Sequence, residues 1–314
     1  MADIFVVASK EFSDIVRSKR FILLVAVFGL ILTAAMGTIY VRVVVTMPTP
    51  PGGAPMPRGF LGMVTYMLIS TMSLFGPVMG VALGCDTISG EREKGTLKIV
   101  LAQPVFRDTV INGKFLAATL AVSIAVFITS LANVGASTMI LGVTPTGEEA
   151  LRLALFMVFS VLFAMTYYGI AVFLSTVSKK TSQSVMLGVT VWAVFTFVIP
   201  IIASLVAFTI APPITGPPGP GEPVEMDIES IRRYTAIVEA ISSITPNHHF
   251  SKVGQYLLNP YATTGGPFLP QPVQEAVSVT RSLTYAGPNI LVLVTVTTLA
   301  FIASYLVFTR QEVR

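Results

Sequence analysis

Charged residues are scarce in this sequence, because Asp, Glu, Lys and Arg make up only 11% of its 314 residues. Soluble globular domains carry about 25% charged residues. So little charge, in a chain that is 53% hydrophobic, excludes that class of protein. Apolar runs recur along the chain, and a helix of about 20 residues crosses a hydrocarbon core of about 30 Å. The composition therefore predicts an all-α polytopic membrane protein.

Cysteine and histidine are also nearly absent. The single cysteine, Cys85, excludes an intrachain disulfide and any metal site built from several cysteines. The only histidines, His248 and His249, are adjacent, and no cluster of carboxylates or thiols accompanies them. We interpret them as a surface pair in an outer loop. Methionines that suit a soft metal ion are more often fillers of helix contacts, and we expect no metal site at Met63, Met67, Met72 and Met79.

Ionisable side chains are missing from every stretch that is long and apolar enough to cross a membrane. We place six spans at about Phe21–Val41, Phe60–Gly84, Phe115–Leu141, Leu153–Val177, Ser184–Ala211 and Asn289–Thr309. None of them contains Asp, Glu, Lys, Arg or His. Proton- and ion-coupled carriers usually hold such groups near the midplane, so the energy for pumping would come from outside the bilayer. A secondary carrier or channel not coupled to ATP remains the alternative, because backbone carbonyls can bind sodium.

The phosphate-binding motif of an ATPase is missing as well. Gly113-Lys114 comes closest to GxxxxGK[ST], but Asp108 stands in place of the first glycine and Phe115 replaces the hydroxyl residue that would hold Mg²⁺. ATP hydrolysis would therefore need a separate subunit. The spans also lack HExxH and any Ser/His or Asp/Asp pair, which argues against an intramembrane enzyme. We expect no catalytic residue and no cofactor on this chain, with ATP and Mg²⁺ on a partner.

Against this background, charge is concentrated in one loop between the second and third predicted spans. The charged loop (residues 86–114) holds Asp86, Glu91, Arg92, Glu93, Lys94, Lys98, Arg107, Asp108 and Lys114. Within it, the sequence predicts a short amphipathic helix from Leu97 to Ala102, with Thr96 as its N-cap and Pro104 as its terminator. We interpret the loop as a docking surface for a soluble partner. An ordinary solvated loop with positive-inside residues is the alternative.

The charged loop resembles the signature loop of type-2 ABC transporter permeases, in particular their NosY-like branch. The resemblance is carried by Asp86, by Glu91-Arg92-Glu93 with Gly95-Thr96-Leu97, by Pro104-Val105 with Arg107, and by Gly113-Lys114. In that family the loop carries the coupling helix, which sits in a cleft of the ATPase subunit. The resemblance therefore implies an ATPase-coupling interface at Asp86, Glu91, Arg92, Glu93, Gly95, Thr96, Leu97, Pro104 and Arg107.

The same resemblance implies an assembly and a location. Type-2 permeases work in pairs, so it implies a homodimer, or a heterodimer with a similar permease, bound to two ATPase subunits. The function implied is that of a membrane subunit of an ATP-driven exporter that works by alternating access in the plasma membrane of a prokaryote. The sequence does not name the substrate, although uncharged spans favour an amphipathic or hydrophobic one. The net charge of +4 does not indicate a nucleic-acid partner, because the basic residues are distributed by membrane side.

The membrane orientation follows from the lysines and arginines. With a cytoplasmic N-terminus, 13 of the 20 fall on the cytoplasmic side and 7 outside, so we expect both termini in the cytoplasm. Residues 1–20 are predicted to form an amphipathic elbow helix whose basic side chains reach lipid headgroups. The next units are residues 21–211, which contain spans one to five, and residues 289–314, which contain the sixth span and the cytoplasmic tail.

The remaining segment, residues 212–288, is predicted to form a small helical cap outside the membrane. Prolines dominate its beginning, and apolar residues then recur at helical spacing from Ile228 to Ile244. Further helices are expected over His248–Leu258 and Pro272–Ala286. In the fifth span, Pro200 is expected to kink the helix. Asn133 is expected to make an interhelical hydrogen bond.

Overall fold

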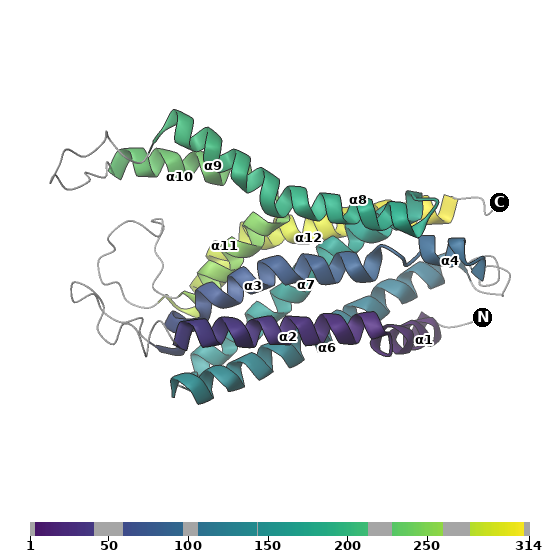
Figure 1. Ribbon diagram of the computed structural model, residues 1–314, viewed down its shortest axis with the longest axis horizontal. Coiled ribbons are helices and arrows are strands. Elements are labelled where there is room, and N and C mark those ends of the chain that lie inside the picture. The colour runs from purple at the N-terminus through teal and green to yellow at the C-terminus, as the bar shows by residue number, and fades with distance from the viewer. Residues whose placement is uncertain are drawn as a thin grey trace.

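The chain folds into a bundle of long helices (Figure 1). The computed structural model describes residues 4–40, 59–96, 106–142, 144–212, 228–259 and 277–310, and these residues contain no β-strand. Five helical stretches among them are long and apolar enough to cross a membrane: Val64–Glu93, Arg107–Met139, Gly147–Val177, Thr181–Ile210 and Val279–Arg310. The predicted all-α polytopic membrane protein is confirmed. Helix α2 (Lys19–Tyr40) covers 22 residues at the first predicted span, and the count of six spans stays a prediction.

Several helices begin before the apolar run that predicted them. Helix α6 (Arg107–Leu141) begins eight residues before Phe115, and α7 (Gly147–Val177) begins six residues before Leu153. A capping box at Thr146 and Glu149 explains the start of α7, because each side chain binds the other residue's backbone N–H. Helices that continue through the membrane surface carry charged residues that composition alone assigns to loops.

The centre of the bundle is the pair α3 (Gly59–Gly84) and α7. Along α3, Gly76, Gly80 and Gly84 face α7, and a Cβ at Gly80 would lie 2.7 Å from the backbone nitrogen of Tyr168. A Cβ at Gly84 would lie 2.7 Å from the Cβ of Ala171. Small residues four apart allow two backbones to touch, as is common between membrane helices. Because these glycines recur every four residues, one face of α3 lets the backbone of α7 approach closely, and α7 is buried as a result.

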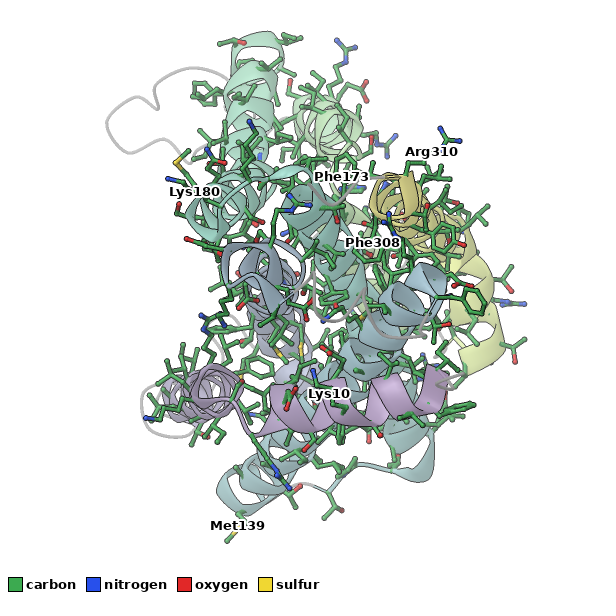
Figure 2. The ribbon with its side chains drawn as sticks, turned by 90° about the vertical axis from the view of Figure 1, so that its right-hand side faces the viewer. Lys10, Met139, Phe173, Lys180, Phe308 and Arg310 are labelled. Atoms are coloured by element: carbon green, nitrogen blue, oxygen red, sulfur yellow. The ribbon has the colours of Figure 1, made fainter. Side chains whose placement is uncertain are left out.

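The two ends of the bundle differ in what they carry. We call the loop end the one that carries α1 (Ile4–Val16), α4 (Ser89–Glu93) and the C-terminal end of α12 (Val279–Arg310), and both chain termini lie there (Figure 1). We call the other the far end. Figure 2 looks onto the loop end, where α1 lies across the helices behind it, and where Lys10, Lys180 and Arg310 lie. The positive charge therefore gathers at the end that also carries α4.

The predicted elbow helix is shorter than residues 1–20. Helix α1 ends at Val16 and α2 begins at Lys19. The chain turns between them because the hydroxyl of Ser18 accepts a hydrogen bond from the backbone nitrogen of Phe21, which starts a new helix. Helix α1 packs on α6, where a Cβ at Gly113 would lie 2.7 Å from a methyl carbon of Val7. Its other face exposes Phe5, as expected for a helix in a membrane interface.

The fifth predicted span is one helix with a break in the middle. It consists of α8 (Thr181–Ala193), a π-helical turn η3 (Val194–Val198) and α9 (Ile199–Ile210). The kink expected at Pro200 has its physical cause here, because proline lacks the N–H that would bind the carbonyl four residues before it. Only 11% of the residues in the most apolar stretch of this helix are buried, and the same fraction holds for α12. The outer faces of both helices are therefore open to lipid or to a partner.

Part of the segment predicted as an outer cap lies inside the bundle. Helices α10 (Ile228–Ser242) and α11 (Pro246–Leu258) form at the predicted places, and α11 packs among α3, α7 and α12. The ring of Phe250 stacks on Phe163, in the middle of α7, with 4.2 Å between centroids. The predicted separate helix over Pro272–Ala286 is wrong, because residues from Val279 onward already belong to α12, which continues through Pro288.

Candidate coupling interface

The backbone that leads into α4 is tied to the end of α7. The backbone nitrogens of Ile88 and Ser89 both donate to the hydroxyl of Ser175, at 3.1 and 2.9 Å. The Ser175 hydroxyl in turn donates to that of Ser89 at 3.0 Å. All of these groups are buried, so the bonds are shielded from water. The beginning of the charged loop is therefore fixed to the bundle.

Two neighbouring charged side chains of α4 extend this attachment. Arg92 donates from its guanidinium to the carbonyls of Ser178, at 2.6 Å, and Thr176, at 3.1 Å, which close the C-terminal end of α7. A cation suits this position because the carbonyls of the last helical turn lack intrahelical partners. Glu93 accepts from the backbone nitrogen of Thr181 at 3.0 Å, at the start of α8. Arg92 and Glu93 thus connect α4 to both sides of the short loop between α7 and α8.

The third charged side chain of α4 belongs to a buried ion cluster. The ammonium group of Lys114, in α6, lies 2.7 Å from Glu91 Oε1 and 2.8 Å from Glu11 Oε2, in α1. The Lys114 side chain is only 5% exposed. The second oxygen of Glu91 is buried and has no hydrogen-bond partner among the described residues. One cation therefore joins the elbow helix α1, the short helix α4 and α6.

The Glu11 carboxyl shows the electrostatic effect of this cluster. Burial by itself would raise the pKa of Glu11, but the charge of Lys114 and its hydrogen bond outweigh burial. The pKa of Glu11 therefore lies below its ordinary value of 4.5. A cleft of about 460 Å³ opens beside the cluster, and α1, α3 and α4 contribute to its lining. The ion pairs of Lys114 thus link the elbow helix to α4.

The other predicted interface residues lie around this cluster. Asp86 pairs with Arg20 at the start of α2. Arg107 donates to the carbonyl of Thr309 at 3.3 Å, which joins the start of α6 to the end of α12. Gly95 has a φ of +72°, a left-handed conformation that favours glycine, and its neighbour Thr96 donates from its hydroxyl to the carbonyl of Glu91 at 3.2 Å.

Two predicted residues cannot be placed. Leu97 and Pro104 lie outside the described residues, as does the predicted helix from Leu97 to Ala102. The remaining seven lie in α4, within three residues of it, or at the first residue of α6: Asp86, Glu91, Arg92, Glu93, Gly95, Thr96 and Arg107. Glu93, Gly95 and Thr96 are exposed there, whereas Glu91 and Arg92 are half-buried and engaged within the chain. The exposed surface therefore begins at the last turn of α4.

Comparison with known proteins decides the class of this chain. The model of a family described as ABC-2 family transporter protein matches residues 5–313. The chain belongs to the ABC-2 family. Two similar proteins are each described as a probable ABC transporter permease protein NosY. The one from Stutzerimonas stutzeri is 26% identical over 204 residues, which are 63% of this chain and 68% of the relative. The one from Pseudomonas aeruginosa is 30% identical over 131 residues, which are 41% of this chain and 46% of the relative.

Membership confirms the resemblance to type-2 ABC permeases that the charged loop indicates. This ABC-2 protein is a multi-pass membrane permease subunit of an ABC transporter, of a family that works with an ATPase subunit. The sequence pattern predicted the loop and included Lys114 in the resemblance, with positive-inside residues as the alternative, but it did not connect Lys114 to Glu11. A signal was present, since both residues interrupt apolar surfaces that meet where Val7 packs against Gly113.

Proposed function

We propose that this ABC-2 permease is the membrane subunit of an ATP-driven exporter, and that its ATPase docks at the loop end. The observation that carries the proposal is the attachment of α4. Arg92 and Glu93 bind the end of α7 and the start of α8, and Glu91 binds α6 through Lys114. A displacement of the loop by an ATPase would therefore reach three long helices directly. Such rigid attachment suits a transporter that alternates between two arrangements of its helices.

The proposal divides the predicted interface residues into two groups with different tasks. Glu91 and Arg92 hold the base of the loop to the bundle through the contacts described above. The exposed residues Gly95 and Thr96, followed by Leu97–Ala102, would contact the ATPase, and so would Glu93, which also accepts from the backbone of Thr181. Asp86 and Arg107 would fix the two ends of the loop, through Arg20 and the Thr309 carbonyl. Pro104 would end the coupling helix.

The same proposal includes the orientation and the assembly. Positive side chains gather at the loop end, which supports placing that end and both termini in the cytoplasm of a prokaryote. The open apolar faces of Thr181–Ile210 and Val279–Arg310 leave room for a second permease copy. A homodimer would present two loops to two ATPase subunits.

Reconstitution with the cognate ATPase tests this function. The permease and the ATPase are co-purified in lipid nanodiscs, and ATP turnover is compared with that of the ATPase alone. We expect a stable complex and stimulated turnover, both of which are lost in the double variant Glu91→Ala/Arg92→Ala. Arg233→Ala removes an exposed ion pair with Glu229, away from the loop, and serves as the control. The assignment fails if complex formation and turnover survive the double change combined with Leu97→Asp.

A further inference from the structure

A single carboxamide joins four elements in the middle of the bundle. Asn247 lies in the first turn of α11, directly after Pro246. Its Oδ1 accepts a hydrogen bond from the hydroxyl of Tyr167, in α7. Its Nδ2 donates to the backbone carbonyl of Ser73, in α3, at 3.3 Å, and to the hydroxyl of Thr196, in η3, at 3.3 Å. The amide thus has bonds to α3, α7 and η3 at once.

The contacts of α11 show that Asn247 lies at mid-depth. At its other end, the carbonyl of Leu258 accepts from Thr65, in the second turn of α3, and the carbonyl of Leu257 accepts from Arg152, near the start of α7. Those positions belong to the far end. A helix of 13 residues is about 20 Å long. Helix α11 therefore runs from the far end to the middle of a hydrocarbon core of about 30 Å.

The helical hairpin α10–α11 is consequently re-entrant, and its turn lies at mid-depth along the bundle. His249 belongs to this turn region, where one ring nitrogen lies 2.8 Å from Asn289 Oδ1 and the other 2.8 Å from the Ser243 carbonyl. His248 and His249, expected as a surface pair, are half-buried here. Ile244, in the turn between the two helices, is 72% exposed.

Thr196 makes the contact to the broken helix. It belongs to the π-helical turn η3, and the residue four positions later is Pro200, which cannot donate to the Thr196 carbonyl. π-turns inside helices are local departures from the regular hydrogen-bond ladder and often occur at functional sites. The hydroxyl of Thr196 therefore ties the bend between α8 and α9 to the tip of the hairpin.

Helix α3 connects this site to the loop end. The carbonyl of Ser73 is part of α3, and the end of α3 leads directly into α4. The close approach of Gly80 and Gly84 to α7 makes α3 and α7 one unit. Any shift of that unit relative to the hairpin must carry Asn247 along or break its bonds. Leaving an amide unbonded at this depth is costly, so the hairpin and the bend are expected to follow α3.

We propose that Asn247 is a positioning residue, through which α3 sets the positions of the re-entrant hairpin α10–α11 and of the bend at η3 during transport. The proposal deepens the proposed function and depends on it, since the shift of α3 is powered by the docked ATPase. The hydrogen bonds that transmit the shift are those to Ser73, Tyr167 and Thr196.

The test places a fluorescent reporter on the hairpin tip. Cys85, the only cysteine, is replaced by alanine, and Ile244→Cys carries a bimane group. Emission is recorded from the permease–ATPase complex in nanodiscs, without nucleotide and after trapping with ATP and vanadate. We expect trapping to shift the emission when Asn247 is present, and Asn247→Leu to abolish the shift while the complex still forms.

A matched pair keeps the test decisive if Asn247→Leu does not fold. Thr196→Val removes the hydroxyl that accepts from Asn247, whereas Thr196→Ser keeps it, and we expect the shift to be lost in the first and retained in the second. An unchanged shift in folded Asn247→Leu or Thr196→Val overturns the proposal. So does a missing shift in the reporter protein with Asn247 and Thr196 intact, if it binds the ATPase and stimulates turnover. Absence of ATPase binding in that protein overturns the proposed function itself, and the inference with it.

Discussion

The ammonium group of Lys114 lies 2.7 Å from the carboxylate of Glu91, and this contact joins α4 to α6. The same nitrogen lies 2.8 Å from Glu11, so three segments that are distant in sequence share one buried cation. A buried ion that loses its partner is costly, because the protein interior cannot solvate it as water does. The stability of the loop end should therefore depend on Lys114 more than on any exposed lysine nearby.

Replacing Lys114 tests this dependence. Lys114→Met leaves two partly buried carboxylates facing each other, and we expect a loss of about 3 kcal/mol in the free energy of unfolding. The matched control is Lys10→Met, since Lys10 also pairs with Glu11 but its side chain is 63% exposed. That change should cost less than about 1 kcal/mol. Unfolding in mixed micelles with increasing SDS measures both, and equal losses would contradict the assigned role of Lys114.

The acid sensitivity of the loop end should depend on Glu11. The pKa of Glu11 is lowered in the folded protein, so its ion pair contributes stability that is complete above the ordinary value of 4.5. That contribution should disappear as the pH falls from 4.5 through the lower pKa of the folded state. Melting temperatures measured across this range should fall less steeply in Glu11→Gln than in the unaltered protein. A slope in Glu11→Gln as steep as in the unaltered protein would contradict this role of Glu11.

Close backbone contact between α3 and α7 predicts which glycines tolerate a methyl group. Gly80→Ala would place its Cβ 2.7 Å from the backbone nitrogen of Tyr168, and we expect a loss of about 1–3 kcal/mol. Gly135, in α6, has no atom of the described residues within 4 Å of the corresponding position. Gly135→Ala should therefore be neutral or stabilise by up to about 1 kcal/mol. Unfolding in SDS compares the two, and a tolerated Gly80→Ala would show that the backbones do not touch.

The guanidinium of Arg152 should control the far end of the re-entrant hairpin. Its side chain is 1% exposed, and it donates to the Leu257 carbonyl at 2.9 Å and to the Ser282 hydroxyl at 3.0 Å. Arg152→Met should speed hydrogen exchange of the backbone amides of α11, because it frees the end of that helix. Arg152→Lys should not restore protection, since an ammonium group cannot reproduce the planar, forked geometry of guanidinium.

The exposed residue Arg233 provides the comparison for this experiment. Arg233 pairs with Glu229 one turn away on α10, with 70% and 58% of the two side chains exposed. Arg233→Met also removes one positive charge, from α10, without touching the end of α11. Exchange in α11 should stay at its original rate. A similar acceleration in both variants would mean that charge, rather than the bonds of Arg152, protects the helix.

The sequence predicts the helices of this protein well because their signals are local. Runs of apolar residues mark the spans, and the spacing from Ile228 to Ile244 marks α10. Thr146 and Glu149, three residues apart, form a capping box at the start of α7. The charged loop stands out by composition, and those of its residues that the structure describes lie at one end of the bundle. The predicted coupling helix, from Leu97 to Ala102, lies outside the described residues and stays a prediction.

The depth of the hairpin is what the sequence does not reveal. Helix α11 contains His248, His249 and Lys252 within 13 residues, a composition that is typical of an aqueous loop. It is held inside by partners far away in sequence, such as Phe163, which stacks on Phe250. No local pattern encodes such contacts. The spans lack ionisable residues, but the bundle does not, because the hairpin brings His248, His249 and Lys252 among the spanning helices.

The touching backbones of α3 and α7 limit how this permease can change shape. At Gly80 and Gly84 no layer of side chains separates the two helices, so there is nothing between them that could rearrange to permit slippage. The two helices should therefore move as one rigid body. Sliding and bending should occur at the helix interfaces where larger side chains lie between the backbones, and at the π-helical turn Val194–Val198. Different conformations of this protein should superimpose on α3 and α7, and diverge outward from them.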